Sequence, residues 1–152
     1  MGGWRVQRSA WEDRFSQPTD QEVLSHYTRQ FRGCAEGIRS VMQALPGMSE
    51  SLEWMGLPWR WTFVYRRQGA SDRLHGYMVP LPTGPRWVLS VSQDVVEHLS
   101  FKSMPRPVRE AFTSATRVGS QLWPQWDVQT KAQVLEVAGV LESVDIEQAV
   151  GT

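Results

Sequence analysis

Apolar residues recur at alternating spacings of three and four between residues 19 and 45, which predicts one long amphipathic helix. The recurring positions are Leu24, Tyr27, Phe31, Cys34, Ile38, Val41 and Leu45. Thr19 and Glu22 form a capping box at the start, because each side chain can bond the backbone amide of the other. Cys34 falls on the apolar face, so we expect it to fill the core.

The pattern changes to a period of two over residues 51–92, which predicts antiparallel strands with short connections. Strands are expected at 52–57, 59–67, 74–81 and 86–92. In the strand 59–67, the rings of Trp59, Trp61, Phe63 and Tyr65 are expected on one face. Pro80 lacks an amide donor, so its strand is expected to end there or to run along an edge.

Helical spacing returns after the strands, with apolar positions that predict helices over 108–122 and 130–144. Residues 93–99 are expected to add one or two helical turns, and 126–128 a short extended piece. Together the elements predict an α+β fold. Its antiparallel sheet of about four to five strands is packed on one face by the N-terminal helix and two C-terminal helices.

The length of 152 residues favours a single domain, which we place at 18–144. An arm over residues 1–17 is expected either to dock its aromatic rings on that domain or to fray, and residues 145–152 are expected to fray. No internal repeat or linker divides the chain.

The charge balance excludes some classes of partner. Basic and acidic residues number 16 each, and such neutrality argues against a nucleic-acid partner. No apolar run is long enough to cross a membrane, and the first residues lack a secretory signal, so we expect a cytoplasmic protein without a membrane partner. Only Lys102 and Lys131 are lysines, and this arginine bias suggests a GC-rich genome.

No catalytic, metal or cofactor motif is present. The histidines lack zinc spacing and the glycines form no phosphate-binding loop, so we expect neither a metal nor a cofactor. Two residues are candidates for acid/base chemistry, namely Glu53 among tryptophans and His75 beside Tyr77. The alternative for Glu53 is a salt bridge with Arg60 or Arg86, and for His75 a structural role.

Eight tryptophans are an unusually high number, and they predict either a core filled with large rings or an aromatic-lined cleft. A cleft between the sheet and the N-terminal helix would be lined by candidates for ligand binding, with an arginine to hold an anion. These candidates are Trp54, Trp59, Arg60, Trp61, Tyr65, Tyr77, Arg86 and Trp87. Because they span both sheet faces, at most half of them can share one pocket.

The order of elements resembles that of the YdhG-like group of small bacterial families, which includes the domain of unknown function DUF3788. The strand Trp61 to Arg66 (WTFVYR) and the reversal Leu81 to Gly84 (LPTG) carry the resemblance, over about residues 18–144. The loop at 68–72 (QGASD) departs from the lysine-rich turn of that group. The resemblance implies a two-layer α+β fold, but no activity.

Three hypotheses for function follow. The first is a non-enzymatic domain that binds a small molecule or a partner in the aromatic cleft. The second is an enzyme with Glu53 or His75 as the general acid or base. The third is a subunit that forms a homodimer through a free sheet edge or an exposed aromatic patch.

Overall fold

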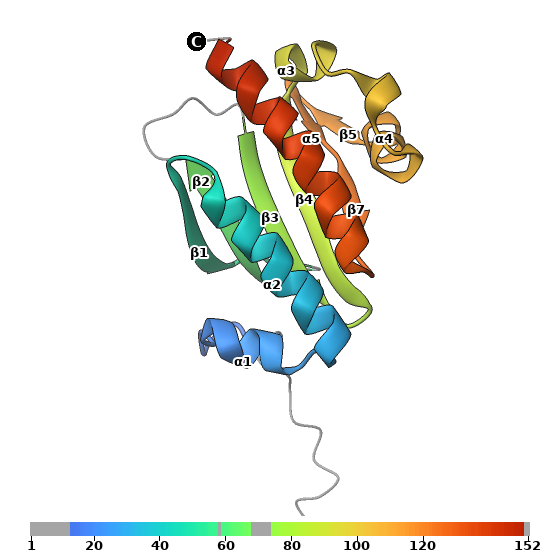
Figure 1. Cartoon of the computed structure of the whole chain (residues 1–152). Coiled ribbons are helices and arrows are strands. Elements are labelled where there is room, and N and C mark those ends of the chain that lie inside the picture. The colour runs from blue at the N-terminus through green and yellow to red at the C-terminus, as the bar shows by residue number, and fades with distance from the viewer. Residues whose placement is uncertain (1–12, 58, 68–73, 151–152) are drawn as a thin grey trace, which may run out of the picture.

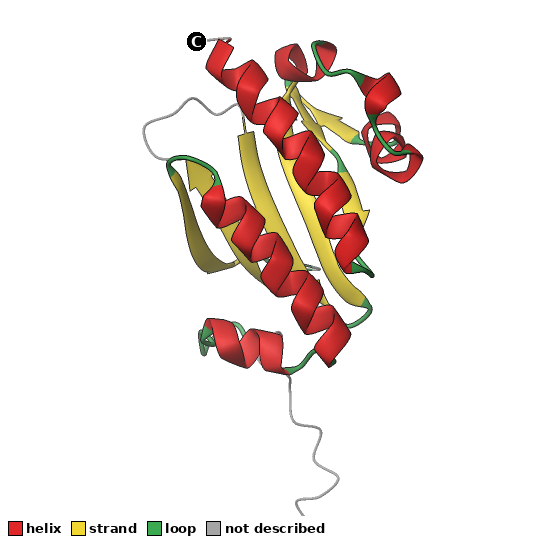
Figure 2. Ribbon diagram, viewed as in Figure 1, coloured by secondary structure: helices red, strands yellow, loops and turns green. Residues whose placement is uncertain are grey.

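The structure is a computed structural model that describes residues 13–57, 59–67 and 74–150. A seven-stranded antiparallel sheet is covered on one face by helices (Figures 1 and 2). The predicted α+β class is confirmed, and the sheet has more strands than predicted. The described residues contain no helix that is both long and apolar enough to cross a membrane.

The elements follow one another in an order that places most of the sheet in the first two thirds of the chain. They are α1 (Asp20–Ser25), α2 (Arg29–Ala44), β1 (Met48–Trp54), β2 (Trp61–Arg67), β3 (Leu74–Leu81), β4 (Gly84–Ser92), α3 (Gln93–Glu97), the 3-10 turn η2 (Phe101–Ser103), α4 (Arg106–Thr113), β5 (Thr116–Val118), β6 (Gln121–Trp123), β7 (Gln125–Asp127) and α5 (Lys131–Val150).

Strand β4 connects the long strands β1 to β3 with the short strands β5 to β7. The strand order is β1-β2-β3-β4-β6-β5, and β7 also pairs with β4. Along its edge away from β3, β4 pairs first with β7, at Arg86 to Val88, and then with β6, at Val91 and Ser92. The predicted meander β1 to β4 is therefore confirmed. Three short strands extend it.

The single N-terminal helix of the prediction is two helices. The capping box at Thr19 is present, and it starts a helix of only six residues. The chain then turns, and the Thr28 hydroxyl accepts from the amide of Phe31 at 3.4 Å to start α2. Tyr27 in the turn is buried, and its hydroxyl donates to the carbonyl of Leu81 at 2.7 Å. The turn thus ends the first helix, but Tyr27 still faces the core as the apolar spacing predicted.

The predicted helix over 108–122 is wrong in its second half. Helix α4 ends at Thr113, and a β5–β6 hairpin follows. Its turn contains Gly119, whose φ of 60° lies in the left-handed region that glycine adopts without strain. Helix α5 extends from Lys131 to Val150.

The core lies between the sheet and the helices, and every described α-helix contributes buried residues to it. Cys34, Ile38 and Met42 of α2 meet sheet residues such as Phe63 and Met78, and all five are fully buried. The expectation that Cys34 fills the core is confirmed, and burial raises the pKa of its thiol. We call this side of the sheet the helix-bearing face and the other side the open face.

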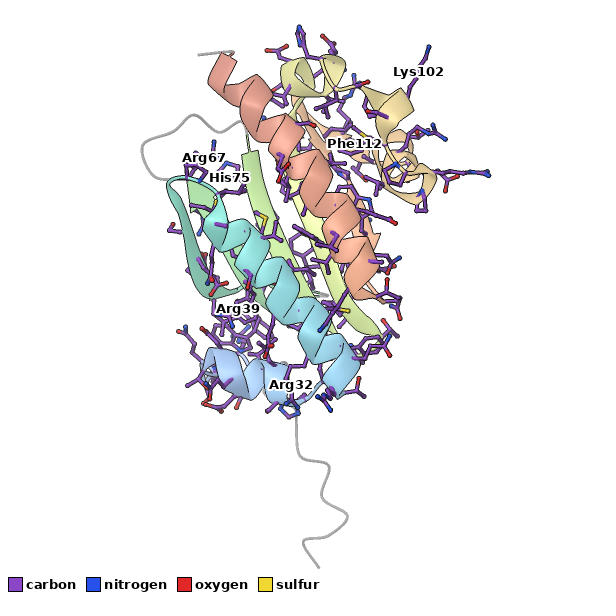
Figure 3. All side chains as sticks on the ribbon, in the orientation of Figure 1. Arg32, Arg39, Arg67, His75, Lys102 and Phe112 are labelled. Atoms are coloured by element: carbon purple, nitrogen blue, oxygen red, sulfur yellow. The ribbon has the colours of Figure 1, made fainter. Side chains whose placement is uncertain are left out.

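Arg39 of α2 ties α1 and β1 together on the helix-bearing side (Figure 3). Its guanidinium donates to Glu50 at 2.7 and 3.0 Å and to Asp20 at 2.8 Å, and it lies 4.7 Å from the centre of the Phe63 ring. The Tyr65 hydroxyl donates to Glu50 at 2.7 Å. The side chains of Arg39 and Glu50 are only 18% and 11% exposed, so the network is largely shielded from water.

The described part of the predicted arm makes two hydrogen bonds to the sheet. The indole of Trp61 donates to the carbonyl of Asp13 at 2.8 Å, and the Gln17 amide donates to the carbonyl of Leu52 at 3.2 Å. The ring of Phe15 does not dock, since it is 85% exposed. The other predicted docking rings, Trp4 and Trp11, lie outside the described residues.

Candidate functional site

Alternation along the strands divides the predicted site residues between the two faces of the sheet. Trp61, Tyr65 and Trp87 lie on the helix-bearing face, and they are 6%, 0% and 0% exposed. They are part of the packed interior, so the predicted cleft between the sheet and the long helix is filled by side chains. Trp54 lies at the rim of this face, half-buried, with its ring 5.7 Å from that of Trp61.

Trp59 is not on the face that the simple alternation predicted. Arg60 has a φ of 60°, and strand β2 begins only at Trp61. A left-handed residue interrupts the extended backbone of a strand. The alternation of side chains between the two faces therefore does not extend back to Trp59. Its indole instead lies 5.3 Å from the ring of Tyr77, whose neighbours Gly76 and Met78 face the helices. Trp59 and Tyr77 therefore share the open face.

Three rings form a continuous row on the open face. The ring of Tyr77 lies between Trp59, at 5.3 Å and an interplanar angle of 56°, and Trp123 of β6, at 5.4 Å and 18°. We call Trp59, Tyr77 and Trp123 the aromatic row. Each ring is half-buried. The row thus combines a fixed geometry with faces that remain partly accessible to solvent.

The aromatic row rests on an apolar strip of the sheet. Val64 and Val88 are the direct cross-strand partners of Tyr77 on its two sides. Their exposures are 1% and 2%, although none of the helices among the described residues covers this face. The rings therefore shield the valines, and the valines in turn support the rings from below. A supported ring loses little freedom when a ligand stacks on it.

An ion pair flanks the aromatic row. The guanidinium of Arg66 donates to both carboxylate oxygens of Glu53, and the Ser51 hydroxyl donates to the same carboxylate. Arg66 holds the pKa of Glu53 below its ordinary value, and Glu53 raises that of Arg66. Burial raises the pKa of the Tyr77 hydroxyl, and the charges of Arg66 and Glu53 also act on it with opposite signs. The ion pair is thus close enough to the row to act on the same ligand.

This geometry does not favour acid/base chemistry. A carboxylate with a lowered pKa stays ionised and is a poor proton donor near neutral pH. Glu53 is paired with Thr62 at the start of β2, whereas His75 precedes Gly76, the partner of Tyr65 near the end of β2. Figure 3 shows His75 at this second end, beside Arg67. The two candidates therefore do not converge on one reacting atom.

The two arginines predicted to hold an anion are both engaged in local structure. The Arg86 side chain donates to Asp127 at 2.7 Å, between paired strands β4 and β7. The backbone of Arg60 closes the turn before β2, through bonds of 2.6 Å to Gly56 and 2.8 Å to Met55.

Sequence reasoning missed Trp123 as a site residue, because it placed this residue at the end of a helix. The signal was the alternation of Thr116 to Trp123 around Gly119, which is typical of a hairpin. Gln121 shares the face of Trp123 and accepts a hydrogen bond from Ser90 at 3.1 Å. The buried indole nitrogen of Trp123 has no hydrogen-bond partner in the described structure.

The search for metal ligands and the comparisons add no identity. Within the described residues, no group of three or more His, Cys, Asp or Glu side chains could hold a metal ion. No protein-family model matches the chain, and no curated protein or solved structure matches it. The resemblance to the YdhG-like group therefore stays a prediction. The aromatic row and its neighbours are the features of this chain that bear on its function.

Proposed function

We propose that this chain is a non-enzymatic binding domain whose open sheet face holds a small molecule with a planar ring. The observation that carries the proposal is the aromatic row. Three rings from three separate segments of the chain form this row, with neighbouring ring centres 5.3 and 5.4 Å apart, on a face that α2 and α5 do not cover. A planar ligand could extend this stack without displacing any helix.

The polar neighbours supply directional groups for such a ligand. Arg66 and Glu53 are paired, but their side chains are 51% and 35% exposed, so donors and an acceptor remain in reach of solvent. Ser90 and Gln121 lie on the same face near Trp123. Binding sites are typically apolar with a few polar groups that fix orientation, and this face has that composition.

The proposal also includes the class of ligand and the location of the protein in the cell. A small molecule is preferred over a nucleic acid, because the net charge of zero gives no attraction for a phosphate backbone. A cytoplasmic location belongs to the same proposal. Homodimer formation through the open face is the competing use of the same rings, and sedimentation at two concentrations separates the two.

The experiment is a fluorescence titration of the full chain. The panel consists of nucleosides and of indole and phenol derivatives, with acyclic compounds of equal charge as controls. We expect saturable changes with some planar compounds only. Trp123→Ala and Trp59→Ala should each weaken that binding by roughly tenfold, since stacking on one ring contributes about 1–3 kcal/mol.

Trp54→Ala is the matched control, because it removes an indole that is equally half-buried but on the other face. The affinity of the Trp54→Ala variant for the planar compounds should equal that of the unmodified chain. Equal losses in all three variants would reject the aromatic row as the site. A panel without any saturable planar ligand, or a chain that sediments as a dimer at both concentrations, would reject the proposal itself.

A further inference from the structure

A hollow lies away from the aromatic row, between α4, β7 and the first half of α5. Figure 1 shows α4, α5 and β7 together toward one edge of the sheet. The hollow has a volume of about 280 Å³. Its apolar wall consists of Pro107, Val108, Ala111, Trp126 and Val137. None of the residues of the aromatic row lines it, so a ligand here would be independent of the function proposed above.

The polar lining of this hollow has one sign of charge. Glu110, Asp127 and Glu136 line it, and no Lys, Arg or His does. Glu110 is paired with Arg106, and Asp127 with Arg86. Glu136 is half-buried, and its carboxylate makes no hydrogen bond or ion pair within the described residues. A half-buried carboxylate beside an apolar wall favours a cationic partner.

The surroundings of Glu136 extend this preference. Glu136 also lines a neighbouring hollow of about 220 Å³, which reaches toward Ser100 and Met104. That hollow too is lined by no Lys, Arg or His. Glu136 therefore borders two hollows, and no cationic side chain of the described structure lines either of them.

Trp126 provides a second, independent feature. It is 8% exposed, and its ring lies 5.7 Å from that of Phe112 at an angle of 68°. Its indole nitrogen is buried without a hydrogen-bond partner in the described structure. The indole is the side chain that attracts cations most strongly, and it forms part of the wall of this hollow.

We propose that this hollow binds a small primary amine with a short apolar chain. The ammonium group pairs with the carboxylate of Glu136, and the chain lies against Ala111, Trp126 and Val137. The volume of about 280 Å³ is slightly below the range typical of pockets for drug-sized ligands, which favours a small amine.

The test uses the full chain and n-pentylammonium chloride as the probe. Pentanol is the neutral control and pentanoate the anionic control, all at one ionic strength. Two-dimensional NMR follows the indole N–H signal of Trp126 during each titration. We expect a saturable shift with pentylammonium, no saturation with pentanoate, and an affinity for pentanol that is about tenfold lower, because the charged hydrogen bond is missing.

Two substitutions on the same helix separate a specific pair from general surface charge. Glu136→Gln keeps the size of the side chain and removes the charge, and it should weaken pentylammonium binding by about tenfold. Glu142→Gln is the matched control, because Glu142 is exposed on α5 and lines neither hollow. It should bind as the unmodified chain does. Circular dichroism confirms that both variants are folded.

Each other outcome overturns the proposal. Equal affinities for pentylammonium and pentanol would show an apolar hollow without preference for a cation. Equal losses in Glu136→Gln and Glu142→Gln would show unspecific attraction to an acidic surface. Absence of a saturable shift would show no site. Trp123→Ala provides the last check: it should leave pentylammonium binding unchanged, so this proposal and the one for the open face fail or succeed separately.

Discussion

At the scale of single residues, the two ion pairs of the sheet differ in how far water reaches them. Arg39 and Glu50 are 18% and 11% exposed, whereas Arg66 and Glu53 are 51% and 35% exposed. An ion pair at the surface contributes little to stability, but removal of one partner from a buried pair leaves an uncompensated charge. The two pairs should therefore respond differently to substitution.

Arg39→Met should lower the free energy of unfolding by about 3 kcal/mol, because it leaves the carboxylate of Glu50 without its cation. Urea unfolding followed by circular dichroism measures the change. The control is Arg106→Met, which removes an i,i+4 pair of side chains that are 79% and 60% exposed. It should cost less than about 0.5 kcal/mol. Similar costs for the two variants would contradict the role assigned to burial.

The pair of Glu53 and Arg66 predicts a dependence on pH. The folded-state pKa of Glu53 lies below its unfolded value, so the pair stabilises the fold above the unfolded pKa. This stabilisation is lost as the pH falls through the folded pKa. The unmodified chain should exceed Glu53→Gln in unfolding free energy at pH 7, by less than about 1 kcal/mol because of exposure. Urea unfolding should show the difference vanish in acid, and a constant difference would contradict the pairing.

At the scale of elements, the prediction was correct where the spacing of apolar residues fitted only one type of secondary structure. The period of two placed β2, β3 and β4 nearly correctly, and the capping box placed the start of α1. The spacing from Val108 to Leu122 fitted a helix equally well, although it contains a hairpin. Likewise, the continuous apolar spacing concealed the turn before Thr28. Tyr27 is apolar and buried in the turn, as it would be on the inner face of one long helix.

The same ambiguity explains the outcome for the candidate site. Trp59 and Tyr77 were predicted as ligand contacts and are part of the aromatic row. Trp61, Tyr65 and Trp87 were predicted too, but only the packing of the helices shows which face is filled. Trp123 was missed together with its hairpin. Alternation therefore identifies which residues share a face, and tertiary packing identifies which face is free.

Two glycines test this assignment of elements with one kind of substitution. Gly119→Ala should destabilise the fold by about 1 kcal/mol, because φ is 60° in the hairpin turn. Gly139→Ala should stabilise it by about 0.5–1 kcal/mol, since Gly139 lies within α5 with open space around its added methyl group. Thermal unfolding of both variants measures the signs. A helix at 108–122 would instead give stabilisation at both positions.

At the scale of the whole molecule, helices cover one face of the sheet and rings cover part of the other. The helix-bearing core contains the largest fully buried side chains, among them Trp87, Tyr65 and Phe63. The open face has a thinner cover, with Val64 and Val88 under the aromatic row. Stability is therefore concentrated on one side. The other side, which has no such layer of helices among the described residues, is where we propose that a ligand binds.

The position of β4 also has a consequence for synthesis on the ribosome. When the part of a nascent chain that has left the ribosome ends at Thr113, it contains α2 and the meander β1 to β4, but neither β6 nor β7. The edge of β4 from Arg86 to Ser92, which those strands later pair, is then open. An unpaired, apolar strand edge is a template for aggregation. Strands β6 and β7 thus protect the edge of β4 from neighbouring chains on a polysome.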